Sequence, residues 1–300
     1  MLRARLSCRR LLALAAIAAC TWSCHAGPGP PPLPPGADPA FDRHLAELDT
    51  RYRFLFAGTS RIFAARMAGA EETLLLDLAK VEGSTNVSIS GDPRLSPDRR
   101  WLLVSYHGDE MDPAGRRLLV LDVHSREVRP VRLPEDQDYE FDIGCYGDDE
   151  LCHWIAPDRF VISYSYYPPG GGERKKFFAY DLADLSVWRE LTFADVDPLI
   201  SRWREGPKPK GPRQVVVDSY HNAEPLFDFE DQASHWDVVV DGHLARRTWN
   251  EVSALRWDEE LALYTWHEYD ARAGTSFVMD EAGRYRPWHR GRWIAKLPRT

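Results

Sequence analysis

A short apolar run that ends in aspartate recurs five times along the chain. The aspartates are Asp77, Asp122, Asp181, Asp241 and Asp280, at intervals of 45, 59, 60 and 39 residues. A second apolar run precedes four of them and ends in a hydroxyl residue followed by an aromatic one. Turn-rich linkers join the two runs, and a short polar turn after the aspartate leads to a further strand. Each unit is therefore predicted to be a β-meander of three or four strands.

The apolar runs are nearly continuous instead of alternating, which is typical of strands that are buried on both faces. The second runs are Trp101–His107, Phe160–Ser165, Val216–His221 and Ala262–His267. Because a lone meander cannot cover two apolar faces, the units must pack against one another, as blades do around an axis. The pattern predicts an all-β fold, a β-propeller of about five blades. Arg51–Phe56 and Trp293–Ala295 could close together into a sixth blade, and a β-sandwich is the alternative fold.

Two stretches of the chain resemble a known repeat. Residues 94–106 (RLSPDRRWLLVSY) and 116–131 (RRLLVLDVHSREVRPV) are similar to the TolB-type, WD40-like propeller repeat. Its hallmark is a Ser-Pro-Asp-Gly turn, an aromatic-led strand, and a strand that ends in Asp before a polar turn. Partial copies lie at 155–164 with 175–191 and at 255–266, while Arg99 and Arg159 replace the glycine of the hallmark. The resemblance implies a propeller fold and specifies no activity.

The amino terminus has the layout of an export signal. Four arginines precede the apolar run Leu11–Ala19, which is too short to span a bilayer and is typical of a signal peptide. Ile17-Ala18-Ala19-Cys20 resembles the bacterial lipobox, which implies cleavage before Cys20 and lipid on its sulfur. An ordinary secretory signal, or lipidation at Cys24, are the alternatives. Thr21 is not aspartate, which by analogy with Gram-negative sorting favours the outer membrane, on its periplasmic or external face.

Three segments follow from this layout. Residues 1–19 are expected to be the lipoprotein signal peptide, residues 20–39 a lipidated Pro-rich tether, and residues 40–300 the propeller domain. The segment Phe41–Leu48 has apolar residues at helical spacing and is expected to brace the first unit.

Composition limits the classes of function. With 44% hydrophobic residues among 300, the chain can bury a large core, and no apolar run suits a polytopic membrane protein. Loss of residues 1–19 removes four arginines and no acid, so the net charge of −8 becomes −12. A domain this acidic is a poor partner for nucleic acid or anionic lipid headgroups. Membrane contact is therefore expected through the lipid anchor alone.

Three of the second runs end in histidine, at His107, His221 and His267. Equivalent positions of a propeller form a ring on one face, so these residues could converge near the axis as a ligand face. Three imidazoles can also bind zinc or copper, although no metal is predicted here. In the alternative interpretation each blade reuses the same aromatic wedge and polar cap, which suits the loss of histidine in Ser163-Tyr164-Ser165.

The insertion at residues 138–153 carries the remaining candidate chemistry. Cys145 and Cys152 bracket a short acidic loop, and export would allow them to form a disulfide. Asp148, Asp149 and Glu150 could bind Ca²⁺ through oxygen ligands. They do not follow EF-hand spacing, so a solvated acidic loop is the preferred interpretation and no cofactor is predicted.

No catalytic motif of the G-x-S-x-G, H-E-x-x-H, Walker or dinucleotide-binding kind occurs in the sequence. The sequence therefore favours a non-enzymatic role, without deciding it. We expect a lipid-anchored module of the cell envelope that binds a protein, peptide or glycan. The alternative is a surface or periplasmic hydrolase or lyase acting on carbohydrate or peptide, with acids and histidines grouped at the axis.

Overall fold

The computed structural model describes nine stretches of the chain. They are residues 38–67, 72–108, 116–132, 141–144, 152–166, 174–198, 211–221, 233–269 and 274–299. The chain divides into Met1–Gly36 and Ala37–Thr300, and all described residues belong to the second unit. The predicted signal peptide and several candidate site residues, namely Cys20, Cys24, Cys145, Asp148, Asp149 and Glu150, lie outside the described residues.

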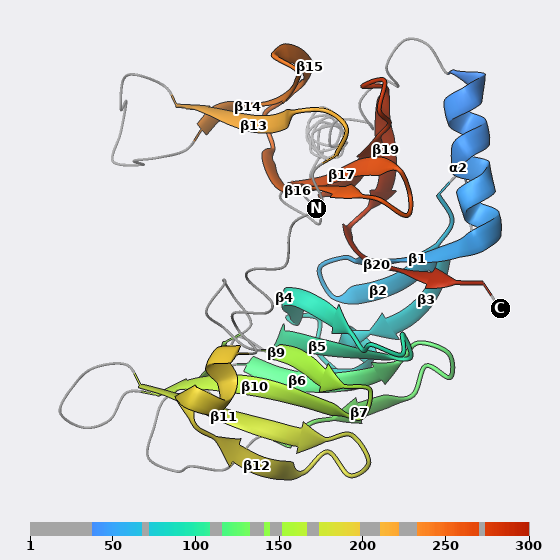
Figure 1. Ribbon diagram of the computed structural model, residues 1–300. Helices are drawn as coiled ribbons and strands as arrows, with labels where there is room; N and C mark the ends of the chain where they lie inside the picture. Colours follow the sequence, from blue (N-terminus) through green and yellow to red (C-terminus); the bar gives the residue numbers. More distant parts are fainter. Residues whose placement is uncertain are drawn as a thin grey trace, which may run out of the picture. The chain divides into compact units, whose positions relative to one another are not determined.

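The described strands form five antiparallel sheets, numbered here in chain order (Figure 1). Sheet 1 has the order β20-β1-β2-β3, with β1 Tyr52–Ala57, β2 Arg61–Ala65, β3 Glu72–Asp77 and β20 Arg292–Pro298. Sheet 2 joins β4 Ser88–Leu95, β5 Trp101–His107, β6 Arg116–Asp122 and β7 Val128–Pro130 in that order. Sheet 4 joins β13 Val215–His221, β14 Ala233–Val240 and β15 His243–Thr248. Sheet 5 joins β16 Glu251–Asp258, β17 Leu263–Tyr269, β18 Thr275–Met279 and β19 Tyr285–Arg290.

Sheet 3 differs in having a divided edge. Its central strand β10 pairs on one side with β11 and on the other with both β8 and β9, and β12 pairs with β11. The bounds are β8 Phe141–Gly144, β9 Cys152–Ala156, β10 Arg159–Tyr166, β11 Arg174–Asp181 and β12 Val187–Leu191. The predicted strand runs therefore coincide with strands in all five sheets, and the chain is mostly β, as expected.

The continuous apolar runs serve two cores at once. In β5, Leu102 and Val104 face a core shared with sheet 1, whereas the intervening Leu103 faces a core shared with sheet 3. All three are at most 1% exposed. Because successive side chains of a strand point to opposite faces, a strand between two sheets needs apolar residues at every position. This explains why the runs do not alternate.

Neighbouring sheets share cores in a fixed order. Sheets 1 and 2 share one core, sheets 2 and 3 a second, sheets 5 and 1 a third, and sheets 4 and 5 a fourth. The sheets thus pack in the order 4-5-1-2-3 instead of as the two facing sheets of a sandwich. The connection between sheets 3 and 4 runs through residues 199–210, which lie outside the described residues.

The two ends of the domain meet in sheet 1 (Figure 1). Strand β20 pairs with β1, with Leu55 opposite Ala295 and Phe56 opposite Trp293. The pairing expected of these segments is confirmed, but it completes the sheet of the first unit and adds no sixth sheet to the described residues. The last strand is thereby fixed to the first.

Two helices flank sheet 1 along the chain, α2 Pro39–Arg51 and α3 Leu78–Glu82. The side chain of Asp38 caps α2 by accepting a hydrogen bond of 2.7 Å from the amide of Ala40. Phe41, Leu45 and Leu48 lie on the buried face of α2 and join the core of sheets 1 and 5, so the expected bracing helix is confirmed. None of the helices in the described stretches has the length and apolarity needed to cross a bilayer.

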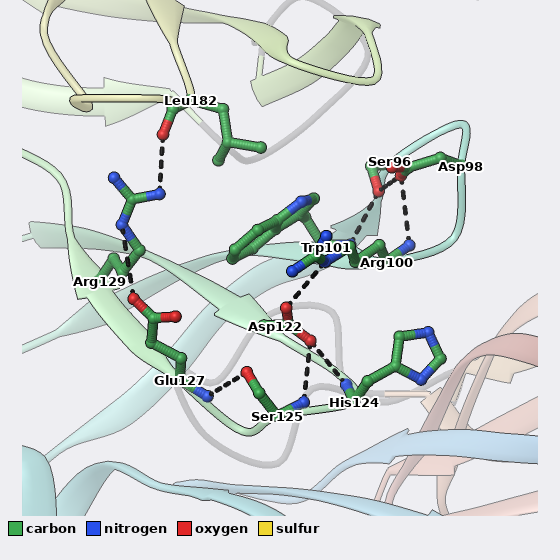
Figure 2. A network of polar contacts seen from close by, with 10 residues as sticks. All are labelled: Ser96, Asp98, Arg100, Trp101, Asp122, His124, Ser125, Glu127, Arg129 and Leu182. Carbon is green, nitrogen blue, oxygen red and sulfur yellow. Dashed lines mark hydrogen bonds and ion pairs between the residues drawn. The ribbon is translucent and has the colours of Figure 1, made fainter.

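The repeated aspartate fixes a turn, as Figure 2 shows for Asp122. Its carboxylate accepts hydrogen bonds from the amides of His124 (2.8 Å) and Ser125 (3.0 Å) and from the Arg100 guanidinium (2.9 Å). Burial would raise the pKa of Asp122, but these hydrogen bonds outweigh it and lower the pKa. The repeated motif is therefore a structural device that closes a strand end.

The same device recurs with variations. Ion pairs join Arg61 to Asp77 (3.3 Å), Arg159 to Asp181 (3.8 Å) and Arg213 to Asp241 (3.3 Å). Three of the aspartates, Asp122, Asp181 and Asp280, end or follow the third strand of their sheet. Asp241 follows the second strand of the three-stranded sheet 4, and Asp77 ends the fourth strand of sheet 1, because β20 supplies the first strand of that sheet. Arg99, which replaces the hallmark glycine, has a φ of 60°, in the region that glycine favours.

Candidate functional site

Edge strands from four of the five sheets bound a single large cavity. Its volume is about 1250 Å³, and its walls come from β20, β4, β16 and the residues leading into β13. Each of these strands stands at one end of its sheet, so each leaves one backbone edge without a strand partner among the described residues. Concave sites placed where separate structural units meet are a usual location of ligand binding.

The cavity is basic although the chain is acidic. Its lining contains five basic and two acidic side chains, whereas the whole chain has a net charge of −8. These residues are Arg94, Arg99, Arg213, Arg256 and Lys296, with Asp92 and Asp258. A local excess of one charge in a concave site focuses its electrostatic field and attracts the opposite charge. The lining therefore favours anions.

Some of these charges are already neutralised within the protein. Lys296 contacts Asp258 at 2.5 Å and Glu260 at 2.9 Å. Arg292 forms an ion pair of 2.9 Å with Asp92, and Arg213 contacts Asp241 at 3.3 Å. By contrast, Arg94, Arg99 and Arg256 form no ion pair with any residue in the described stretches. These three guanidiniums supply the uncompensated positive charge of the cavity.

Arg256 is fixed by an aromatic ring. Its guanidinium carbon lies 4.1 Å from the centre of the Trp293 ring, a cation–π contact. Solvent reaches the side chain from the cavity, yet the surrounding protein lowers the pKa of Arg256 by desolvation. Asp258 and Asp92 act in the opposite direction, whereas Arg94 lowers the pKa further by repulsion. Arg94 and Arg256 therefore both line the cavity and repel each other across its wall.

Bulges place these two arginines. In β4, Ser90 lies opposite Ser105, but Arg94 lies opposite Leu103, so two extra residues are accommodated, with Gly91 at a φ of 64°. In β16, Ser253 lies opposite His267 and Arg256 opposite Thr265, so one extra residue is accommodated, with Ala254 at a φ of 55°. Bulges change the direction of the side chains that follow and are common beside functional sites.

The third lining strand is bulged as well. Between the pairs Leu55–Ala295 and Phe56–Trp293, strand β20 carries one extra residue, Ile294, which also lines the cavity. The positive φ of Ala254 is unusual because its Cβ makes that conformation unfavourable. Register shifts also occur in other strand pairs of the protein, and those in β4, β16 and β20 are the ones whose residues line the cavity.

The opposite wall is held by Tyr264. Its hydroxyl accepts a hydrogen bond from the amide of Arg213 and donates one to the carbonyl of the same residue, both at 2.7 Å. A Cβ on Gly211 would lie 2.1 Å from this hydroxyl, so only glycine fits there. Burial raises the pKa of Tyr264, which therefore stays protonated near neutral pH and can donate this bond.

The candidate histidines are distributed over three sheets. His107 ends β5 of sheet 2, His221 ends β13 of sheet 4, and His267 lies in β17 of sheet 5. His107 and His267 do not line the cavity, and His267 is only 2% exposed, with its ring 4.5 Å from that of Tyr269. The side chain of His221 is not among those that the structure describes. A shared ligand face for the three histidines stays a prediction.

Of the candidate cysteines, Cys152 lies in β9 and is buried. Because Cys145 is outside the described residues, the predicted disulfide and the possible Ca²⁺ site beside it stay predictions. Within the described stretches, no cluster of three or more His, Cys, Asp or Glu side chains is arranged to hold a metal ion.

Sheets and cavity together define a mostly-β protein of repeated antiparallel sheets with a basic cavity between them. No protein-family model matches the sequence, and no curated protein matches it. Similar solved structures include a dipeptidyl peptidase 4 from Porphyromonas gingivalis, with 13% identity, a TM-score of 0.32 and coverage of 78% of this chain and 37% of that one. The AtxE2 isopeptidase has 11% identity and a TM-score of 0.34, with coverage of 84% and 46%.

TolB from Acinetobacter baumannii is also similar, with 14% identity, a TM-score of 0.23 and coverage of 83% of this chain and 67% of that one. The chain spans less than half the length of the two peptidase structures. Likenesses this low assign no activity to the chain, so its function has to be inferred from the cavity itself.

Proposed function

We propose that this protein is a lipid-anchored β-propeller of the cell envelope that binds a ligand in the cavity between its sheets. Support for the ring comes from the packing order 4-5-1-2-3 together with the pairing of the two chain ends in β1 and β20. Contact between sheets 3 and 4 would complete five blades. In such a ring, the edge strands that bound the cavity would be the innermost strands of their blades.

The observation that carries the binding role is the composition of the cavity wall. A purely structural junction between sheets would be filled with apolar side chains, as the four shared cores are. This junction instead leaves about 1250 Å³ open, lined with arginines and with Trp257, Tyr264 and Trp293. That volume exceeds the range of about 300–1,000 Å³ usual for small-molecule pockets, so it could hold a short segment of a peptide or glycan.

The arrangement favours binding over hydrolysis. Glycoside hydrolysis needs two carboxyl groups that are free to exchange protons or attack the substrate. The two carboxylates of the cavity are instead engaged, Asp92 by Arg292 and Asp258 by Lys296. These ion pairs favour a binding role for the cavity over a hydrolytic one.

Site-directed crosslinking tests whether the cavity is occupied in cells. Leu255 lines the cavity, whereas Leu244 is 54% exposed on sheet 4 and lies outside it, so the two make a matched pair of apolar positions. With photoreactive benzoylphenylalanine at either position of the full chain, illumination of intact cells should give a discrete adduct only from position 255. Absence of an adduct there, or the same adducts from both positions, would refute the proposal.

The anchor has a separate test. Labelling of cells with a radioactive fatty acid should mark the wild-type protein and the Cys24→Ala variant but not Cys20→Ala. Equal labelling of the two variants would exclude Cys20 as the lipidated residue, and the binding role could still hold for a protein exported without an anchor.

A further inference from the structure

We infer that the cavity binds an organic carboxylate, whose anionic group lies between Arg94 and Arg256. This inference rests on the proposed function and adds the chemical class of the ligand. The two arginines project from bulges in different sheets, β4 of sheet 2 and β16 of sheet 5, onto the same cavity.

The first argument is electrostatic. Both guanidiniums are exposed to solvent in the cavity, and a ligand that covers them must supply a negative charge, because removing a charge from water without an acidic partner is costly. Arg94 and Arg256 have no such partner among the described residues, and they repel each other. An anion placed between them would replace this repulsion by two attractions, and hydrogen bonds between charged groups are about twice as strong as neutral ones.

The second argument is preorganisation. Trp293 lies under Arg256 at 4.1 Å and is itself supported by Trp288, whose ring centre is 5.2 Å away. The contact with the ring restricts the guanidinium before a ligand arrives, which reduces the entropy lost on binding. A planar guanidinium that is restricted in this way suits the two oxygens of a carboxylate.

The third argument concerns the charge and the body of the ligand. Asp92 and Asp258, although both are engaged in ion pairs, still act on Arg256 and offset part of its charge, so a singly charged carboxylate is favoured over a doubly charged phosphate. Leu95, Leu255 and Trp257 form an apolar part of the same wall. An apolar or ring-shaped body attached to the carboxylate would cover these side chains.

Calorimetric titration of the purified full-length protein at low ionic strength tests the inference. The probe is hippurate, a carboxylate with an aromatic body, and its neutral amide is the control ligand. We expect a millimolar Kd for hippurate, at least tenfold weaker binding of the amide, and at least tenfold weaker hippurate binding by Arg94→Gln and by Arg256→Gln. Arg290→Gln, an exposed site outside the cavity with the same change of charge, should bind hippurate as the wild type does.

Thermal unfolding separates loss of binding from loss of folding. Because each substitution removes one of two repelling charges, the Arg94→Gln and Arg256→Gln variants should unfold at the wild-type temperature or above it. Undiminished hippurate binding by these folded variants would overturn the inference, and so would tighter binding of phenyl phosphate than of hippurate.

Together with the calorimetry, the crosslinking experiment shows whether the carboxylate inference or the proposed binding function has failed. If position 255 yields an adduct in cells but hippurate does not bind, the carboxylate inference fails and the binding role stands. If position 255 yields no adduct, the proposed function fails and the inference fails with it.

Discussion

Replacement of Asp122 by alanine should destabilise the protein far more than the same change at Asp181. The two residues hold corresponding positions at the ends of β6 and β11. The Asp122 side chain is 1% exposed and accepts three hydrogen bonds, from two backbone amides and from Arg100. The Asp181 side chain is 30% exposed, accepts one hydrogen bond from the amide of Ala183, and is 3.8 Å from Arg159.

These differences set the expected magnitudes. A hydrogen bond to a charged group contributes about 1.5–3 kcal/mol, but water can replace the carboxylate at the exposed His124 and Ser125. We therefore expect about 3 kcal/mol for Asp122→Ala. For Asp181→Ala we expect about 1 kcal/mol, because an exposed ion pair contributes little. The pKa of Asp122 is lowered, so its stabilisation is fully present above the ordinary value of 3.8 and is lost as the pH falls through the lowered pKa.

Urea unfolding of the full chain, followed by tryptophan fluorescence, measures both variants. Reversibility has to be checked by refolding, since a comparison of free energies requires it. The difference between wild type and Asp122→Ala should also shrink in strongly acidic buffer, where the wild-type carboxyl becomes protonated. Equal destabilisation by the two substitutions, or a larger effect at Asp181, would refute the view that the repeated aspartate acts through its turn contacts.

Three further substitutions test other parts of the fold. Burial and Arg94 lower the pKa of His153 to about 4, so the free energy of unfolding of the wild type should fall by on the order of 3 kcal/mol between pH 6.5 and 4. In urea titrations over the same pH range, His153→Gln should lose much less. Glu268→Gln should cost about 3 kcal/mol in urea unfolding, because it leaves the mostly buried Arg246 unpaired between sheets 4 and 5. Leu45→Ala should cost about 2–5 kcal/mol by removing a fully buried side chain of α2, whereas the exposed Glu47→Ala should be neutral by the same measurement.

The strands could be predicted because their signal is local. Trp101–His107 is a strand with those bounds, and helix α2 buries Phe41, Leu45 and Leu48 as its spacing indicates. The pairing of the chain ends was expected as well, but its sheet was not. The sequence does not show that β20 joins sheet 1 instead of forming a sheet of its own with β1, because this pairing is determined by packing between segments more than 200 residues apart.

The cavity could not be predicted, because its residues come from four separate sheets. Its two arginines from bulged strands, Arg94 and Arg256, lie neither in an aspartate run nor in one of the runs that end in histidine. The sequence holds one weak indication of this site. Ser90 and Ser253 each precede an arginine by a few residues, and each arginine is followed by one of the runs that end in histidine. The number of residues in between differs, and only the pairing of the adjacent strands reveals that both segments are bulged.

The bulges explain how one repeated unit can serve both folding and binding. In regular pairing, consecutive side chains alternate between two packed faces, and every position of the strand is then committed to a core. One inserted residue in β16, or two in β4, interrupt this alternation locally, so the arginine that follows can turn toward the cavity while the rest of the strand keeps its pairing. Ala254 at a φ of 55° shows the conformational cost of this change in β16, where no glycine relieves it. Register shifts occur in several other strand pairs as well, so the cavity is distinguished by the arginines that follow the bulges of β4 and β16 and not by the bulges alone.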